Sequence, residues 1–250
     1  MSKEGILVGA DRKVEWLLNF WWSHYKKYNA LPVTFIDFGM SSKAKKWCAA
    51  RGTVVPLDQE APVISKSKID PERAKRWEEA HGKQVWEHRK SWYKKPFALL
   101  LTPYERTLWL DLDCEVLGPL SGLFEFCTGD IALVREPEAA HRNEKSQGQL
   151  LPQEILYNSG VILYRKNAPL IQLWAQAVQE QNGTFWGDQQ LLSRLIHLNR
   201  FKVRELPPEY NWRMSQGVHF HAFIVHWVGS WGKEFIRKYG GLTSHLLELK

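Results

Sequence analysis

The feature that most constrains the fold is a short apolar run at residues 107–110 that ends in two carboxylates, Asp111 and Asp113. The run shows no polar alternation, which is typical of a strand buried on both faces, and such strands belong mainly to parallel sheets covered by helices. Charge is costly inside such a core, so the two aspartates mark the end of the strand, where an open α/β sheet forms its ligand crevice. We therefore expect a central strand that delivers both carboxylates to a site.

Two interpretations of this Asp-x-Asp are open from the residues alone. Two carboxylates one residue apart can hold a hard cation through oxygen ligands, and the cation can in turn hold a diphosphate. Aspartates are also common in solvated turns, where they cap the next segment. Residues elsewhere in the chain are needed to distinguish a cation site from a turn.

The alternation of strands and helices before this run indicates an α/β protein. Strand-like runs at residues 5–10, 32–38 and 53–56 are separated by helical spacings that extend to about residue 29 and from 41 to about 50. Such alternation implies right-handed crossovers and a parallel, Rossmann-like sheet. The glycine fingerprint of dinucleotide enzymes is absent near the first turn, which disfavours a nicotinamide or flavin cofactor.

The remaining elements follow the same logic. An apolar segment at 94–101 carries Lys95 towards the crevice, and residues 136–153 are polar enough for a mobile lid or an ordinary surface loop. We expect further elements in this order: a charged helix at 72–92, a short helix at 120–126, strands at 130–134 and 157–164, helices at 168–181 and from 188, a strand at 201–206, and an apolar run at 223–228 followed by a Gly-rich turn.

Composition and cysteine usage limit the classes of protein to which the chain can belong. The chain has 250 residues, 44% of them hydrophobic and 24% charged, which suits a single globular domain over residues 1–250. No apolar stretch approaches the roughly 20 residues that span a bilayer. No secretory h-region precedes the first strand, and Cys48, Cys114 and Cys127 lack the spacing of a disulfide framework or a zinc site. We expect a cytoplasmic protein with free thiols and at most a peripheral association with membranes.

Several polar residues stand where a site would form, each with a structural alternative. Asp11 and Asp188 occupy positions suited to a helix N-cap or to the crevice. His226 ends an apolar run and is followed by a flexible turn and Lys233, so imidazole on a cation and ammonium on a phosphate would complete a metal-diphosphate site. A structural histidine is the alternative. Gly160 allows close approach of the backbone to a ligand.

Taken in chain order, these features resemble the GT-A nucleotide-sugar glycosyltransferases, in particular the family 8 and glycogenin-like group. The resemblance covers roughly residues 5–235. It rests on Asp-Leu-Asp at 111–113, the Lys-Pro segment at 95–96 with Tyr-Glu-Arg-Thr-Leu-Trp at 104–109, Asn-Ser-Gly-Val-Ile-Leu at 158–163, Gly-Asp-Gln at 187–189, and His-x-x-Gly at 226–229. The resemblance implies a GT-A, three-layer α/β/α fold with a mostly parallel central sheet, in which residues 1–113 form a nucleotide-binding half and 114–250 an acceptor-side half.

The resemblance also implies roles for individual residues. A divalent cation, Mn²⁺ or Mg²⁺, would be held by Asp113 and His226, with Asp111 on the cation or the donor ribose. Asp188 and Gln189 would lie near the reacting carbon as catalytic residues. Contacts with the UDP-sugar are implied for Ala10, Asp11, Lys95, Asp111, Asn158, Gly160, Gly229 and Lys233.

One position departs from the family pattern. The family commonly places a lysine six residues after the histidine, usually followed by Pro-Trp. Here Gly232 stands at that position, Lys233 comes seven residues after His226, and Trp231 precedes the lysine. This departure leaves the phosphate contact of Lys233 open.

The resemblance and the chemistry together predict metal-dependent transfer of a hexose from a UDP-sugar to a carbohydrate or glycoconjugate acceptor. The group usually retains the anomeric configuration, and Trp186 and Trp231 are candidates for orienting the acceptor sugar. We expect no nucleic-acid partner, because glutamates interrupt the basic residues of the charged helix. The alternatives are a haloacid dehalogenase-type phosphatase, whose Asp-x-Asp normally lies near the chain start, and a non-catalytic protein that binds nucleotides or glycans.

Overall fold

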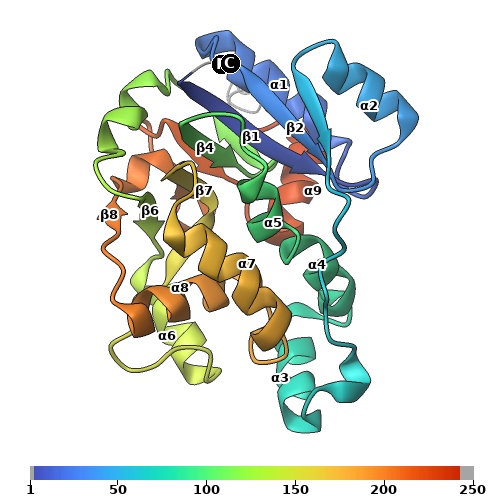
Figure 1. Ribbon diagram of the computed structural model, residues 1–250, viewed down its shortest axis with the longest axis vertical. Coiled ribbons are helices and arrows are strands. Elements are labelled where there is room, and N and C mark those ends of the chain that lie inside the picture. Colours follow the sequence, from blue (N-terminus) through green and yellow to red (C-terminus); the bar gives the residue numbers. More distant parts are fainter. Residues whose placement is uncertain (1–2, 243–250) are drawn as a thin grey trace.

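The computed structural model describes residues 3–242 and is built around a seven-stranded sheet in the order β3-β2-β1-β4-β7-β6-β8 (Figure 1). β7 runs antiparallel to its neighbours β4 and β6, and the other neighbouring strands in this sheet are parallel. The predicted α/β class and the central position of the Asp-x-Asp strand, β4, are confirmed. The strands are β1 Glu4–Ala10, β2 Val33–Asp37, β3 Thr53–Pro56, β4 Arg106–Leu110, β6 Ile131–Arg135, β7 Tyr157–Arg165 and β8 Arg204–Glu205.

Helices cover both faces of the sheet, because its inner strands are apolar on both sides. Leu108 and Leu110 of β4 face one hydrophobic cluster and Trp109 faces the other. The first cluster includes buried residues of α1 (Leu17–Tyr28), α2 (Ser42–Ala49) and α9 (Gly229–Tyr239), and the second includes those of α5 (Lys95–Leu100), α7 (Pro169–Gln181) and α8 (Asp188–Asn199). The predicted three-layer arrangement is therefore confirmed.

A second, three-stranded sheet was not predicted. β5 (Cys114–Val116) pairs antiparallel with β10 (Ile224–His226), which pairs in parallel with β9 (Trp212–Arg213). Strands of two or three residues are too short to show a periodic pattern, so the sequence gives little sign of them. The register sets His226 opposite Cys114, which places the imidazole beside Asp113.

Three sequence-based assignments are wrong. Residues 136–153 contain α6 (Glu138–Ser146), because good helix formers follow Pro137 and outweigh the polar character that suggested a loop. The charged helix at 72–92 is two helices, α3 (Pro71–His81) and α4 (Val85–Trp92), separated at Gly82, which has a φ of +73°. The Gly-rich turn after His226 is the first turn of α9.

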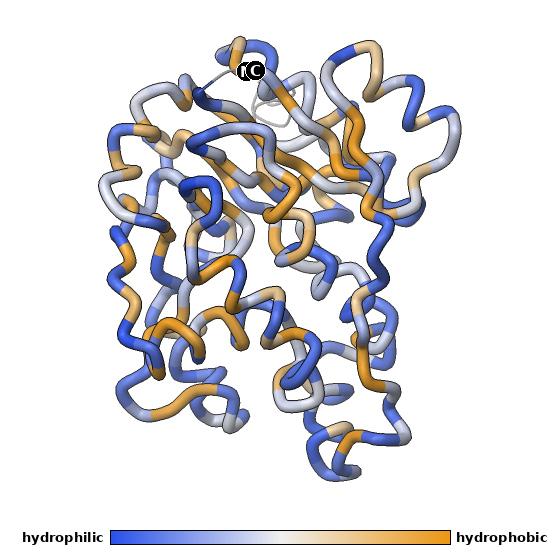
Figure 2. Tube along the Cα trace, viewed as in Figure 1, coloured by the Kyte–Doolittle hydropathy of each residue, from blue (hydrophilic) through white to orange (hydrophobic). Residues whose placement is uncertain are grey.

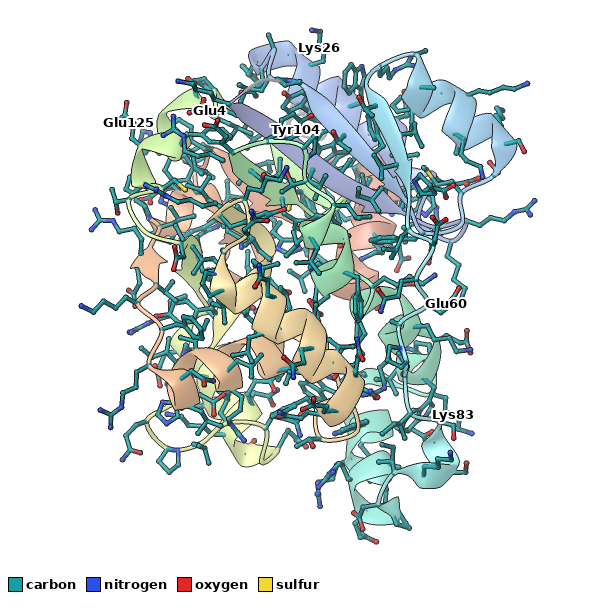
Figure 3. All side chains as sticks on the ribbon, viewed as in Figure 1. Glu4, Lys26, Glu60, Lys83, Tyr104 and Glu125 are labelled. Atoms are coloured by element: carbon teal, nitrogen blue, oxygen red, sulfur yellow. The ribbon has the colours of Figure 1, made fainter. Side chains whose placement is uncertain are left out.

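α3 and α4 form an arm with a small hydrophobic cluster of its own, which includes Trp77, Val85 and Trp186. Figure 2 shows the strands of the main sheet as mostly apolar and the arm around α3 as mostly hydrophilic. Charged side chains such as Lys26, Glu60 and Lys83 lie on the outside of the molecule (Figure 3). The short 3₁₀ helices are Lys66–Lys68, Ser121–Phe126, Pro208–Tyr210 and Met214–Gln216.

Within residues 3–242, no helix combines the length and the apolar character that crossing a membrane requires.

Candidate active site

A cleft of about 980 Å³ lies at the carboxyl ends of β1 and β4 and at the start of β7. This is where an open α/β sheet is expected to bind ligands. Most of the residues singled out from the sequence line it: Asp11, Lys95, Asp111, Asp113, Asn158, Gly160, Trp186, Asp188, Gln189, His226, Gly229 and Lys233.

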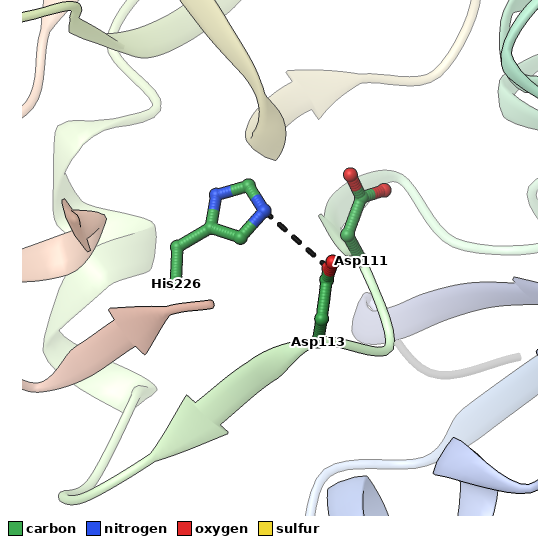
Figure 4. A group of neighbouring side chains, drawn as sticks. All are labelled: Asp111, Asp113 and His226. Carbon is green, nitrogen blue, oxygen red and sulfur yellow. Dashed lines mark ion pairs between the residues drawn. The ribbon is translucent and has the colours of Figure 1, made fainter. Parts of the chain in front are cut away.

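Asp111, Asp113 and His226, which all line this cleft, come together in one group (Figure 4). Each offers one ligand atom, and these three atoms lie within 4.8 Å of one another. The Nε2 atom of His226 is 3.4 Å from Oδ1 of Asp113. The end of β4 supplies the carboxylates and β10 supplies the imidazole, so both sheets are needed to assemble the group.

Hydrogen bonds fix the orientation of the His226 ring. The Nδ2 amide of Asn211 donates to Oδ1 of Asn158 at 2.8 Å, so Oδ1 of Asn211 is left to accept from Nδ1 of His226 at 3.0 Å. Nε2 is then the ring nitrogen that faces Asp113. Metal-binding histidines are typically oriented in this way by a hydrogen bond on the other ring nitrogen.

Gly160 leaves the space that this ring occupies. A Cβ atom at position 160 would overlap with the imidazole of His226. The backbone of Gly160 also accepts a hydrogen bond from the amide of Asp111 at 2.8 Å. The sequence suggested that this glycine lets a ligand approach the backbone, whereas in the structure a nearer reason is that His226 needs the room.

Lys233 extends from α9 to Asp113, with its Nζ atom 2.5 Å from Oδ2. The structure accounts for the departure from the family pattern, because a Cβ at Gly232 would already overlap with the backbone of Trp227. A lysine cannot occupy position 232 without moving α9, and the next residue supplies the ammonium group instead. Burial alone raises the pKa of Asp113, but the charges of Lys233 and His226 outweigh it and hold that pKa well below its usual range.

Lys95 joins the carboxylates on the other side of the cleft. Its Nζ atom is 3.1 Å from Asp111, 3.5 Å from Asp188 and 2.9 Å from the carbonyl oxygen of Ser159. Burial alone lowers the pKa of Lys95, but the two carboxylates raise it overall, so the lysine stays charged. Burial raises the pKa of Asp188 despite the opposing effect of Lys95.

The geometry decides whether Asp188 and Asp11 cap a helix or belong to the cleft. Gly187 is the N-cap of α8, and the carboxylate of Asp188 instead accepts from the hydroxyl of Ser159 at 3.0 Å. Asp11 is not the N-cap of α1, which begins at Leu17 after Trp16. One of its oxygens accepts from the backbone of Lys13 and Val14 in the turn before the helix, and the other accepts from Ser91 at 2.6 Å in the cleft wall.

Solved structures of glycosyltransferases share this architecture. The galactosyltransferase LgtC, in complex with donor and acceptor sugar analogs, is similar with a TM-score of 0.61 and 16% identity over 95% of each chain. Mouse xyloside xylosyltransferase 1 gives a TM-score of 0.54 at 18% identity, over 89% of this chain and 97% of that one. The glycosyltransferase GlyE of Streptococcus pneumoniae TIGR4 gives 0.58 at 14% identity, over 92% of this chain and 55% of that one.

The chain has the GT-A fold. No protein-family model matches the sequence, and no curated protein matches it in sequence. The likeness is therefore one of structure, at sequence identities that establish the fold. The GT-A fold was implied by the order of the motifs in the sequence, and that implication is confirmed.

Sequence reasoning missed Glu136, a buried carboxylate of the cleft with three side-chain partners. It lies just after β6 in the GT-A sheet and accepts hydrogen bonds from Asn158 at 2.8 Å, Gln189 at 2.9 Å and Arg213 at 2.6 Å. A weaker form of the signal that identified Asp111 was present here, because Glu136 follows the strand β6, but the charged Arg135 separates it from the apolar run. Arg213 and Asn211 had no such signal, because they lie beside or within the two-residue strand β9.

Two residues named from the sequence lie outside the cleft lining. The side chain of Ala10 is buried in the core, and its carbonyl oxygen accepts from Phe38 at 2.9 Å. Trp231 lies on α9 and is 56% exposed. Its ring packs against Phe235 of the same helix and against Trp227, which precedes the helix. Trp186 does line the cleft, although its ring is almost fully buried against His81.

Proposed function

We propose that this chain is a metal-dependent glycosyltransferase that moves a hexose from a UDP-sugar to a carbohydrate or glycoconjugate acceptor, with retention of configuration. The observation that carries the proposal is the grouping of Asp111, Asp113 and His226 in the cleft of a GT-A fold. Glycosyl transfer is what the structurally similar proteins are named for.

The donor set fits a divalent cation. Two carboxylates and an imidazole would neutralise it and bind it through oxygen and nitrogen, a mixture that suits Mn²⁺ better than Mg²⁺. The hydrogen bond between Nδ1 of His226 and Asn211 fixes the ring so that Nε2 is the nitrogen that would bind the cation. When bound, the cation would offset the negative charge that builds on the departing diphosphate.

The protein groups around this position have distinct tasks in the proposed reaction. Lys233 is within reach of the cation position and would transfer its ammonium contact from Asp113 to a phosphate oxygen of the donor. Lys95 holds Asp111 and Asp188 in fixed positions on the sugar side. Asp188 and Gln189, tied to Ser159 at the start of β7, would orient the sugar near its reacting carbon.

The test is a screen for UDP release from UDP-sugars, with and without Mn²⁺, comparing the wild type with Asp113→Ala. We expect at least a 100-fold loss of metal-dependent turnover in the variant, about 3 kcal/mol of lost transition-state stabilisation. Asp58→Ala, an exposed loop position, serves as the matched control. Full activity of Asp113→Ala would refute the assignment.

The same screen separates the alternatives. Release of inorganic phosphate from simple esters, without UDP release, would favour the phosphatase. Mn²⁺-dependent binding of UDP without turnover of any UDP-sugar would favour a non-catalytic nucleotide-binding protein.

We also propose a cytoplasmic location. It is supported by Cys48, Cys114 and Cys127, which are buried free thiols rather than disulfides. Cell fractionation of the expressed protein tests this location.

A further inference from the structure

A polar network crosses the boundary between the two sheets beside the imidazole of His226. Glu136 lies just after β6, and its backbone amide donates to the carbonyl oxygen of Leu156 at 2.9 Å, which fixes it to the segment before β7. Its carboxylate accepts from Arg213 of β9 at 2.6 Å. Arg213 lies opposite His226 in the register of β9 and β10, so this ion pair joins the main sheet to the sheet that carries the imidazole.

A second link between the sheets runs through two amide side chains. Asn158 of β7 donates to Oε1 of Glu136 at 2.8 Å and accepts from Asn211 at 2.8 Å. Asn211 precedes β9 and contacts Nδ1 of His226 at 3.0 Å. The orientation of the His226 ring, and with it the position of Nε2 beside Asp113, therefore depends on a chain of hydrogen bonds that begins at Glu136.

The third partner of Glu136 is Gln189, in the first turn of α8. Its Nε2 atom donates to the same Oε1 of Glu136 at 2.9 Å, and its own Oε1 atom accepts from the backbone amide of Ser159 at 3.1 Å. With an acceptor on one side and a donor on the other, the amide group of Gln189 can point in one way only.

The chemistry of these partners explains why a carboxylate stands at position 136. Arg213, Asn158 and Gln189 are all donors, and a carboxylate can accept on both oxygens at once. A glutamine would offer one oxygen in place of two and would direct its own amide hydrogens at one of these donors. Glu136 is buried, and unpaired polar groups are costly at such a position.

We propose that Glu136 is a positioning residue that holds the imidazole of His226 and the amide of Gln189 in place at the same time. The inference rests on the proposed function, in which His226 binds the cation and Gln189 lies near the reacting carbon. Removing a group that orients a metal ligand through hydrogen bonds typically lowers metal affinity or activity by about 10- to 100-fold. Glu136 acts through its neighbours and needs no contact of its own with the substrate.

The test compares leucine with glutamine at position 136 in a background that lacks Arg213. The variants are Glu136→Leu/Arg213→Met and Glu136→Gln/Arg213→Met, which have the same net charge as each other and as the wild type. Glutamine keeps an oxygen that can accept from Asn158 and Gln189, and leucine does not. A difference between the two variants therefore reports the acceptor at position 136 and excludes an effect of charge.

The matched control is a second buried pair of a carboxylate and an arginine, which does not line the cleft. Glu154 accepts from Arg194 at 2.7 Å, and the side chains of this pair are buried to a similar degree as those of Glu136 and Arg213. Glu154→Leu/Arg194→Met shows how much a general loosening of the fold contributes. Chemical unfolding gives the stability of each variant.

Three measurements separate positioning from a purely structural role. Isothermal titration gives the Mn²⁺ affinity. Two-bond ¹H–¹⁵N spectra of the metal-free protein report the imidazole of His226, whose signals are assigned with His226→Gln. UDP release at saturating Mn²⁺ gives kcat and the KM for the UDP-sugar. The first two measurements need no turnover.

We expect Glu136→Leu/Arg213→Met to bind Mn²⁺ about tenfold more weakly than its glutamine counterpart, and to show a shifted or broadened ring signal for His226. Its kcat should be about tenfold lower, with the KM for the UDP-sugar changed less than about twofold, because misaligned groups slow the reaction more than they weaken donor binding. The glutamine variant and the control should keep most of the wild-type affinity and the wild-type ring signal.

Four results would overturn the inference: equal Mn²⁺ affinity in the leucine and glutamine variants, a ring signal of His226 that leucine leaves unchanged, a kcat that leucine leaves unchanged, or an equal loss of affinity in the control pair. Failure of the proposed function would look different. The wild type would then release no UDP from any UDP-sugar, while the Mn²⁺ affinity and the ring signal would still decide whether Glu136 positions His226. If the wild type bound no Mn²⁺, the ring signal of the metal-free protein would decide it.

Discussion

At the scale of single residues, the site depends on glycines that leave space as much as on the side chains that would bind the cation. The imidazole of His226 lies where a side chain at position 160 would be, and α9 approaches Trp227 where a side chain at position 232 would be. Both glycines have ordinary negative φ angles, so the requirement is one of volume and not of backbone conformation. Protein interiors are packed too densely to absorb an added methyl group at such a position without movement.

Gly160→Ala tests the first of these positions. The added methyl group should displace the ring of His226 and weaken Mn²⁺ binding by about tenfold or more, with an accompanying loss of stability of about 1–3 kcal/mol from overpacking. Isothermal titration with Mn²⁺ and chemical unfolding measure the two effects. Gly129→Ala is the control, because nothing lies within 4 Å of a Cβ there. Unaltered Mn²⁺ affinity in Gly160→Ala would show that His226 is not a ligand.

At the scale of elements, the arm of α3 and α4 is joined to the segment before α8 by a buried arginine. Arg89 is fully buried, and its guanidinium donates to the carbonyl oxygens of Asn182 at 2.8 Å, Trp186 at 3.2 Å and Phe185. Asn182 is the C-cap of α7, so the positive charge lies at the negative end of that helix dipole. The contact holds the residues that lead directly into Asp188.

Replacing Arg89 with Met should therefore leave several buried carbonyl groups without a donor. We expect the free energy of unfolding to fall by about 3 kcal/mol, since each unsatisfied buried group costs about 1–3 kcal/mol. Urea denaturation measures this change. Arg76→Met, at an exposed position on α3, should remain within about 0.5 kcal/mol of the wild type. An equally small change in Arg89→Met would mean that the arm is held by its apolar contacts.

At the scale of the whole molecule, a buried ionic contact joins the first helix to the second sheet and to the carboxyl-terminal part of the chain. Glu115 of β5 lies 3.3 Å from Nε2 of His24 on α1, and it accepts hydrogen bonds from Trp227 at 2.9 Å and from the amide of Leu242 at 2.7 Å. Burial alone lowers the pKa of His24, but the Glu115 carboxylate raises it, and the net shift is upward.

This shift makes stability depend on pH in a defined direction. A histidine whose folded pKa exceeds its unfolded value of 6.5 contributes fully below that value, and the contribution is lost as the pH rises through the folded pKa. The melting temperature of the wild type should therefore fall more between about pH 5.5 and about pH 8.5 than that of His24→Gln. Differential scanning calorimetry at both pH values gives the comparison. Parallel pH profiles for the two proteins would exclude a role for this contact.

The sequence by itself determined where the main strands lie along the chain, that the Asp-x-Asp strand is central, and which polar residues follow it. Apolar runs such as 107–110 and 161–164 are long enough to indicate buried strands. Because carboxyl ends of parallel strands meet at one edge, Asp111 and Asp113 were expected in a crevice, and the structure adds Asp11, for which the sequence left a helix cap equally open. The order of the motifs also implied the GT-A fold, which the solved structures confirm.

Only the tertiary structure decided how His226 reaches Asp113, since that requires β5, β9 and β10, whose two or three residues carry no periodic signal. It also decided that α6 is a helix with a polar buried side, because its packing depends on distant groups such as Leu156 and not on an apolar stripe. Long-range pairing of short segments is set by the geometry of the assembled core.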